Sequence, residues 1–153
     1  GGGTIFYLRT FFAFAALLFV VSCSGNGIQA TQIAQSIGNS VGGGKVYVLR
    51  DTGGIGVLDT VTVKLNGQSI GELGEKETAF GNSSSGTNFL SARMNGLAGM
   101  STNDAPVVLY EKRTGKNNFF LINMYLATLT GTLGLNEVSE DVFRKRALGS
   151  KFW

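Results

Sequence analysis

Apolar and polar residues alternate along much of the chain after residue 45. Residues 60–65, TVTVKL, place an apolar side chain at every second position, which is the period of a strand with one buried face. Asn66 and Gly67 follow directly, and this pair tolerates the positive φ angles of a type I′ turn. Residues 61–73 are therefore predicted to form a β-hairpin, with Gly71 marking a bulge in the return strand.

Other segments have the composition of strands separated by turns. The segment 46–50 (VYVLR) is rich in β-branched and aromatic residues, and the segment 87–94 (TNFLSARM) alternates, with Leu90, Ala92 and Met94 on one side. Two further strands, 106–112 (PVVLYEK) and 118–129 (NFFLINMYLATL), are predicted to pair with each other across the turn between them. Surface loops are predicted at 82–86 and 95–104.

A helix is predicted directly after Ser139. This serine can cap the helix, acids occupy the first turn, and the cations 144–146 stand near the end. About six to eight short strands with turns roughly every 8–12 residues predict a mainly all-β domain over 45–153. We expect an antiparallel β-sandwich or a partly rolled sheet with a short C-terminal helix.

The longest uncharged apolar run near the start, residues 10–21, has a different character. It is shorter than the roughly 20 residues of a transmembrane helix, but it fits the roughly 7–15-residue apolar core of an export signal. The only cysteine of the chain, Cys23, follows almost at once. A second uncharged stretch, 117–136, contains Asn123 and two glycines, which favour a sheet over a membrane span.

Residues 20–23 (VVSC) resemble the lipobox of bacterial lipoproteins. The resemblance implies cleavage between Ser22 and Cys23, removal of residues 1–22 as a signal peptide, and attachment of a diacylglycerol to the Cys23 thiol. Two or more acyl chains such as palmitate, at about 0.8 kcal/mol per buried methylene, make a lasting membrane anchor. An ordinary cleaved signal peptide and an uncleaved short anchor remain as alternatives.

The residues after Cys23 bear on the location and reach of the domain. Ser24 is not the aspartate associated with inner-membrane retention, so the periplasmic face of the outer membrane or the cell surface is favoured over the inner membrane. Residues 23–44 are small, polar and uncharged, and we expect a lipidated N-terminus with a flexible linker. Ile28, Ile33 and Ile37 also fit one face of a short helix, which is the alternative for this segment.

The order of the elements resembles a bacterial lipoprotein domain family of unknown function, and the hairpin is also similar to that of PEGA-type surface modules. The resemblance covers about residues 45–146 and rests on VYVLR, VTVKLNGQSIGEL, KNNFFLIN and EVSEDVFRK. Those relatives usually have a proline-glycine turn before the third strand, where this chain has SSSG at 83–86. The resemblance implies a β-rich lipoprotein domain and carries no activity.

Composition excludes several classes of chemistry. The net charge of +3 is too small and dispersed to indicate nucleic acid, and the absence of histidine removes the usual general base and the commonest metal ligand. The GGGK at 42–45 lacks the hydroxyl residue of a phosphate loop and leads into a strand. Asp51 and Asp59 lack the further oxygen ligands of a calcium site. We expect no cofactor and no metal.

Two other features allow a functional interpretation. The cations 144–146, with Lys151, Phe152 and Trp153, suit an anionic lipid surface, although a solvated helix end is favoured. Phe119, Phe120 and Tyr125 suit a ligand groove, although core packing is favoured.

These observations favour a lipid-anchored envelope protein that is not an enzyme but a binding or structural module. Its partners would be the membrane, through Cys23, and an envelope protein or glycan, met by a sheet edge or loops. One alternative is an envelope hydrolase or carbohydrate-processing enzyme that uses carboxylates such as Asp51, Asp59 and Glu111. Another is a secreted, unanchored small β protein.

Overall fold

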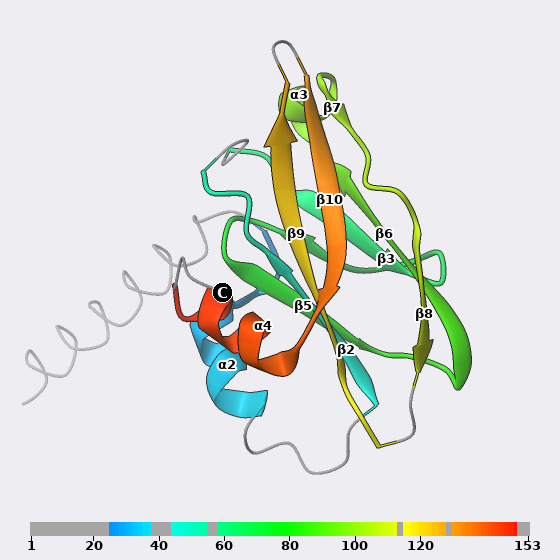
Figure 1. Ribbon diagram of the computed structural model, residues 1–153. Helices are drawn as coiled ribbons and strands as arrows, with labels where there is room; N and C mark the ends of the chain where they lie inside the picture. Colours follow the sequence, from blue (N-terminus) through cyan, green and yellow to red (C-terminus); the bar gives the residue numbers. More distant parts are fainter. Residues whose placement is uncertain (1–24, 38–43, 55–57, 113–114, 128–129, 150–153) are drawn as a thin grey trace, which may run out of the picture.

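The computed structural model describes residues 25–37, 44–54, 58–112, 115–127 and 130–149 (Figure 1). The strands form two sheets that pack face to face. Sheet A has the order β1 (Ile28–Gln29), β5 (Glu77–Asn82), β2 (Lys45–Arg50), β9 (Asn118–Leu126), β10 (Gly131–Val138), β7 (Thr102–Asn103). Sheet B has the order β4 (Gln68–Leu73), β3 (Val61–Leu65), β6 (Gly86–Met94), β8 (Val108–Lys112). The mainly β fold with two sheets and a short C-terminal helix is confirmed.

The main core lies between the two sheets. Sheet A contributes every second residue of β2 and β9, such as Val48 and Phe120, and sheet B contributes the alternating residues of β3 and β6, such as Val63 and Leu90. The period of two predicted for β3 and β6 is confirmed, because one face of each strand is buried in this core. Burial of this apolar surface is the main stabilising contribution to the sandwich.

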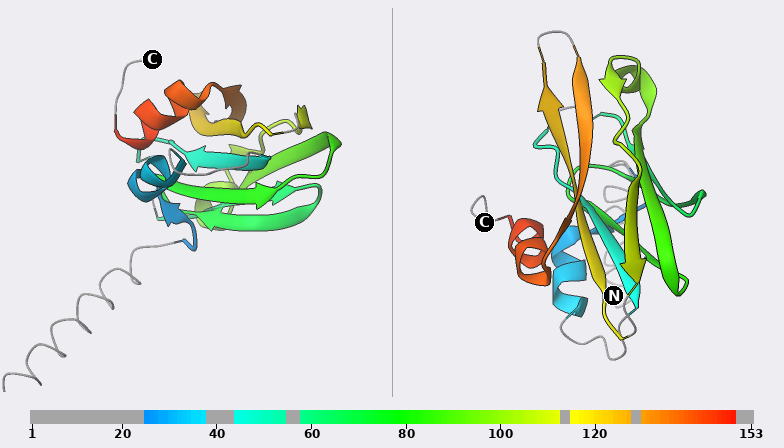
Figure 2. Two further views of the ribbon diagram at one scale, coloured as in Figure 1. Left: turned by 90° about the horizontal axis from the view of Figure 1, so that it is seen from below. Right: turned by 45° about the vertical axis from the view of Figure 1, so that its right-hand side comes forward.

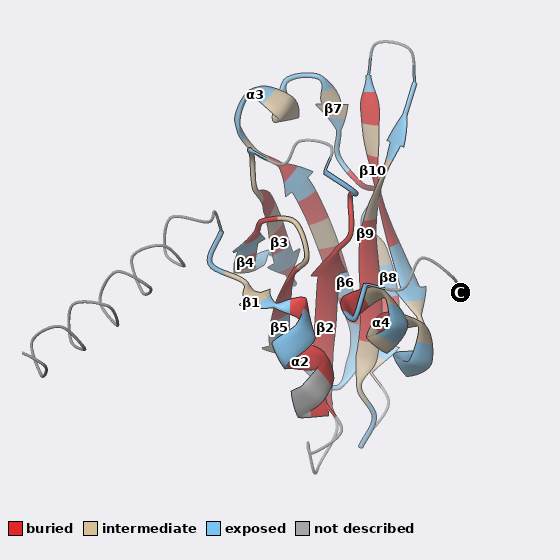
Figure 3. Ribbon diagram, turned by 90° about the vertical axis from the view of Figure 1, so that its left-hand side faces the viewer, coloured by how far each residue is buried: buried red, intermediate tan, exposed pale blue. Residues whose placement is uncertain are grey.

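A second core lies on the other side of sheet A, where helices α2 (Ala30–Ile37) and α4 (Glu140–Ala147) cover the sheet (Figures 2 and 3). The ring of Phe119 stacks on Tyr47 at 5.3 Å and meets Phe143 of α4 at 5.1 Å. Strand β2 and residues 119–122 of β9 are thus buried on both faces, which explains their nearly continuous apolar sequence.

The flexible linker predicted for 23–44 is wrong over residues 25–37, and the domain boundary at 45 is wrong with it. Strand β1 pairs with β5, and α2 buries Ala30, Ile33, Ala34 and Ile37 against sheet A. These four residues recur at the spacing of one helix face, which makes the helix amphipathic. The apolar face stabilises the helix on the sheet, so the alternative of a short helix is the correct one.

Local predictions elsewhere agree with the structure. Asn66 and Gly67 have φ values of 50° and 84° at the tip of the β3–β4 hairpin. The pairing register of β3 and β4 shifts directly after Val63, which lies opposite Gly71, so an irregularity lies where the bulge was predicted. The hydroxyl of Ser139 accepts a hydrogen bond from the Val142 N–H at 3.2 Å, so Ser139 caps α4.

The pairing predicted between the segments 106–112 and 118–129 is wrong. Strand β8 pairs with β6 in sheet B, whereas β9 lies between β2 and β10 in sheet A. The chain crosses from one sheet to the other between β8 and β9, and the β2–β9 and β7–β10 pairs are parallel rather than antiparallel. Strand β9 carries apolar residues on both faces, so burial in the middle of the helix-covered sheet stabilises it. This stabilisation outweighs the preference of two strands with a short connection to pair with each other.

Two further segments differ from the expectation. The loop predicted at 95–104 contains the one-turn helix α3 (Gly96–Gly99) and strand β7. The uncharged stretch 117–136 holds the antiparallel β9–β10 pair of sheet A. Within the described part of the chain, no helix has the length and apolar character to cross a membrane.

Candidate functional site

The outer face of sheet B carries a row of polar side chains. Lys64 on β3 lies opposite Ser91 on β6, and Thr62 lies opposite Arg93. Successive residues of a strand point to opposite faces, so these four residues share the face that points away from the core. Both α2 and α4 lie on the far side of sheet A (Figure 2), so neither helix covers this face.

A hollow of about 550 Å³ lies on this face. Its floor is made by β3 and β6, and its wall is the segment that runs from the end of β6 to the start of β8. The volume falls within the roughly 300–1,000 Å³ of small-ligand pockets. The polar and apolar side chains that line it include Thr62, Lys64, Ser91, Arg93, Asn95, Met100, Asp104 and Val107.

The wall of the hollow is held by hydrogen bonds to sheet B and to sheet A. The Asn95 amide Nδ2 donates to the hydroxyls of Thr60 and Thr62, at 3.0 and 2.7 Å. The Gly131 N–H donates to the Ser101 carbonyl at 3.0 Å. The wall is therefore fixed at its start and in its middle rather than being an independent loop.

Two glycines allow the wall to fold back on β6. Gly96 has a φ of 67°, in the left-handed region. A Cβ on Gly99 would lie 2.2 Å from the Met94 carbonyl oxygen, so the backbone at this point approaches more closely than any side chain permits. The glycine-rich composition of this segment, which predicted only a loop, is thus required for the shape of the hollow.

Asp59 and Arg50 connect the wall to the interior. A carboxylate oxygen of Asp59 accepts a hydrogen bond from the Ala98 N–H at 3.0 Å. The guanidinium of Arg50 donates to the backbone carbonyls of Asp59 and Leu73, at 2.6 and 2.9 Å. Arg50 is fully buried, and this burial lowers its pKa, opposed by the charge of Glu75. No sequence pattern indicated this role, because Arg50 stands at the end of an ordinary strand.

The electrostatics of the hollow are dominated by two cations. Within the described residues, neither Lys64 nor Arg93 forms an ion pair. Asp104 is the single carboxylate on the lining. The hollow thus combines two available cations with one acid, hydroxyls and an amide.

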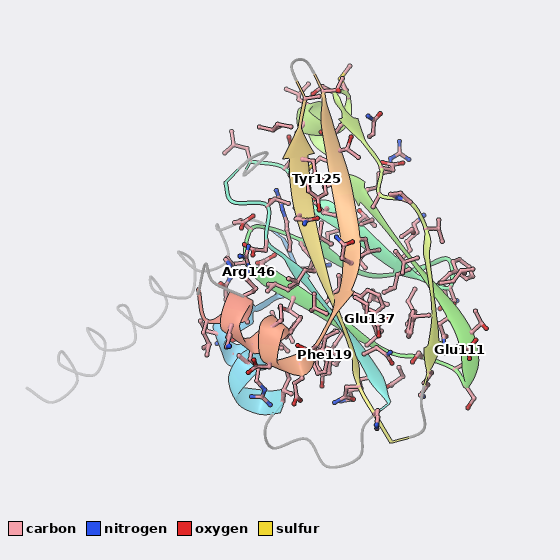
Figure 4. All side chains as sticks on the ribbon, viewed as in Figure 1. Glu111, Phe119, Tyr125, Glu137 and Arg146 are labelled. Carbon is pink, nitrogen blue, oxygen red and sulfur yellow. The ribbon has the colours of Figure 1, made fainter. Side chains whose placement is uncertain are left out.

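The three carboxylates named for the alternative of an enzyme do not come together. Asp51 is buried. It forms an ion pair with Lys76, at 2.9 Å, and accepts a hydrogen bond from Arg146 of α4, at 2.5 Å. Asp59 holds the wall as described, and Glu111 is exposed on β8, where it accepts from the hydroxyl of Thr87. Figure 4 shows Arg146, the partner of Asp51, and Glu111 on opposite sides of the molecule.

One smaller hollow, of about 290 Å³, does contain two acids, Glu111 and Glu137. Glu137 accepts a hydrogen bond from the Asn118 amide at 3.0 Å. The described part of the chain has no cluster of three or more metal-ligating side chains.

The aromatic residues proposed for a groove lie in separate places. Phe119 packs among Tyr47 and α4 in the second core, and Phe120 is buried in the main core. Tyr125 is exposed on the extended part of β9, where its hydroxyl accepts from the Asn123 amide at 3.0 Å (Figure 4). The structure therefore agrees with core packing for the two phenylalanines.

The cations of α4 each lie beside an acid. Arg144 and Lys145 pair with Glu140 and Asp141, at 3.6 and 3.1 Å, and Arg146 pairs with Asp51. This pairing lowers the positive potential that an anionic lipid surface would need. Lys151, Phe152 and Trp153 lie outside the described residues.

The residues proposed for lipidation and cleavage, Cys23 and Ser22, also lie outside the described residues, as do Gly42 and Gly43 of the GGGK stretch. The remaining part of that stretch leads directly into β2.

Comparisons with known proteins add a structural likeness but no family. No protein-family model and no curated protein matches the sequence. A solved structure described as an NMR structure of a protein from Eubacterium rectale is similar, with a TM-score of 0.36 and 12% identity, over 62% of this chain and 88% of that one.

Proposed function

We propose that this chain is a lipid-anchored bacterial envelope protein whose β-sandwich acts as a non-catalytic binding module. The lipid on Cys23 would hold the domain at a membrane, and the hollow on sheet B would meet the ligand or partner. The observation that carries the binding role is this hollow, which gathers available polar groups, while Asp51, Asp59 and Glu111 are each engaged elsewhere.

The position of the first described residues supports a short connection to the anchor. Asn26 exchanges two hydrogen bonds with the backbone of Glu72, at 2.9 and 2.7 Å, and β1 pairs with β5 directly afterwards. Cys23 precedes Gly25 by two residues, which span at most about 7 Å. A lipid on Cys23 would therefore hold the β4–β5 end of the domain against the membrane, without the long reach of a flexible linker.

Metabolic labelling tests the anchor. Cells that express the full chain are grown with radiolabelled palmitate, and the protein is recovered from membrane and soluble fractions. We expect label on the wild type in the membrane fraction and none on Cys23→Ser, with Ser24→Ala as the labelled control. An unlabelled wild type that is folded and soluble outside the cytoplasm would contradict the proposal.

Accessibility to a bulky maleimide reagent tests the short connection. Glu72→Cys lies at the anchored end and Ser85→Cys at the far end of β5, and both side chains are exposed. In membranes we expect slow labelling of Glu72→Cys and fast labelling of Ser85→Cys. Insertion of about ten glycine and serine residues after Ser24 should make the two rates equal, because such a linker is flexible. Equal rates without the insertion would contradict the short connection.

A further inference from the structure

We propose that the hollow on the outer face of sheet B binds an acidic sugar, a hydroxylated ring that carries a carboxylate. This inference rests on the proposed binding function and names the class of ligand for the same site. It is argued from the placement of the cations, the hydrogen-bonding groups beside them and the apolar rim.

The two cations can converge on one carboxylate. Lys64 lies opposite Ser91, and Arg93 is two residues further along β6, so Lys64 and Arg93 are diagonal neighbours on one face. Diagonal neighbours in an antiparallel pair are about 7–8 Å apart at the backbone, within reach of long side chains. An arginine presents a planar fork that matches both oxygens of a carboxylate, and a lysine adds a point charge.

The groups beside the cations suit hydroxyls rather than a bare anion. The Asn95 amide donates through Nδ2 to Thr60 and Thr62, so its Oδ1 atom is left as an acceptor. Asp104 adds a carboxylate acceptor to the lining, and Ser91 adds a hydroxyl. A sulfate ion or a fully ionised phosphate monoester has no donor for these acceptors, whereas a sugar hydroxyl donates and accepts.

The rim supplies an apolar contact for the carbon face of a sugar ring. Met100 and Val107 line the hollow and are 84% and 57% exposed. An exposed methionine is adaptable, because its side chain is unbranched and polarisable. Bound ligand would cover both residues and remove their apolar surface from water.

Two contacts hold the wall of the hollow in place. Asp59 fixes α3 through the Ala98 N–H, and the Cβ-free backbone of Gly99 allows close approach to β6. The site is therefore formed before the ligand arrives, which lowers the entropic cost of binding.

Titration of the full chain in detergent micelles with trigalacturonate tests the proposal, measured by calorimetry. The fully methyl-esterified trimer is the neutral control, and pentaglutamate is the control for a peptide carboxylate. We expect trigalacturonate to bind. The affinity for the ester should be lower by a factor of roughly ten or more, because charge-assisted hydrogen bonds are lost. Arg93→Ala and Lys64→Ala should each weaken binding by a similar roughly ten-fold factor.

Lys145→Ala is the matched control, because it removes one positive charge from exposed α4 and should leave the affinity unchanged. Circular dichroism of each variant verifies folding, and Lys64 and Arg93 are exposed, so both variants should fold. Absence of trigalacturonate binding, equal binding of the ester, or equally tight binding of pentaglutamate would overturn the proposal. These results leave the palmitate experiment untouched, so the ligand class and the anchored function can fail separately.

Discussion

The two outer faces of the sandwich differ in composition and in whether helices cover them. On sheet A the outward residues in the middle of β2 and in the first half of β9 are aromatic or aliphatic, such as Tyr47 and Leu121, and two helices cover them. On sheet B the outward residues of β3 and β6 at the hollow are hydroxyls and cations, such as Lys64 and Arg93, and the apolar Phe89 further along β6 stays 41% exposed. An apolar face must be removed from water, whereas a polar face can remain hydrated and available for a ligand.

The contrast also explains why the first part of the domain folds back. Figure 3 shows α2 and α4 side by side against the buried strands of sheet A. Arg144 of α4 donates to the Ala34 carbonyl of α2 at 2.9 Å, which joins the two helices. The segment expected to be a linker is thus part of the cover that sheet A requires.

A matched pair of phenylalanines gives the largest expected difference between the faces. Phe143→Ala, at a fully buried position against Tyr47 and Phe119, should lower the free energy of unfolding by about 3–5 kcal/mol. Phe89→Ala, on sheet B and 41% exposed, should lower it by about 1 kcal/mol or less. Urea denaturation measures both. Equal losses would show that the two faces do not differ as described.

The attachment of α4 can be tested by a pair of aspartates. Asp51→Asn leaves Lys76 and Arg146 facing a neutral group at a nearly buried position, and we expect a loss of about 2–3 kcal/mol. Asp141→Asn removes an exposed pair with Lys145 and should cost about 0.5 kcal/mol or less. Thermal unfolding and urea titration of both variants measure the two losses in the free energy of unfolding. A larger effect at Asp141 would contradict the role of Asp51.

Substitution of Gly99 sharpens the description of the open face. Gly99→Ala brings a Cβ against the Met94 carbonyl, so the wall must move. We expect a loss of about 1–2 kcal/mol in the free energy of unfolding, together with shifted amide signals of the wall residues in NMR spectra. Ser101→Ala in the same segment is the control. Unchanged wall signals in Gly99→Ala would mean that this close approach does not shape the hollow.

The smallest expected effect concerns Glu77, beside the first residues of the domain. Burial raises the pKa of Glu77, opposed by hydrogen bonds from the backbone of Gly74 and Gly27. A raised folded-state pKa means that stability is present below the unfolded value of about 4.3 and is lost as pH rises through the folded value. Glu77→Gln does not titrate, so its stability relative to the wild type should rise from about pH 4 to about pH 7. A constant difference in melting temperature would contradict this expectation.

The elements that were predicted correctly depend on neighbours in the chain. The Asn66–Gly67 turn, the alternation of β6 and the Ser139 cap each involve groups within a few residues of one another. Local backbone preference and the period of burial are sufficient for such features. The same reasoning found the alternation within β3 and within β6, although it did not pair these two strands or identify a site on them.

The candidate site could not be read from the sequence, because its parts come from distant segments. The hollow needs β3, β6 and the wall, and the wall needs Asp59, which lies 39 residues before Ala98. The carboxylates considered for catalysis, Asp51 and Glu111, are separated by pairing with cations and hydroxyls that lie far away in the chain. The type of a residue determines the chemistry that its side chain can perform, but the tertiary packing determines which groups the side chain contacts.

The sequence by itself determined the mainly β composition of the domain, the tip of its first hairpin, the capped C-terminal helix and the alternation of buried and exposed positions in β3 and β6. The tertiary structure decided that β8 and β9 belong to different sheets, that residues 28–37 belong to the domain, and that a wall encloses the polar face. The physical reason is that local turns and caps are set by hydrogen bonds between near neighbours. Sheet membership and helix docking are set by burying apolar surface, and the residues that share such a surface are far apart in the chain.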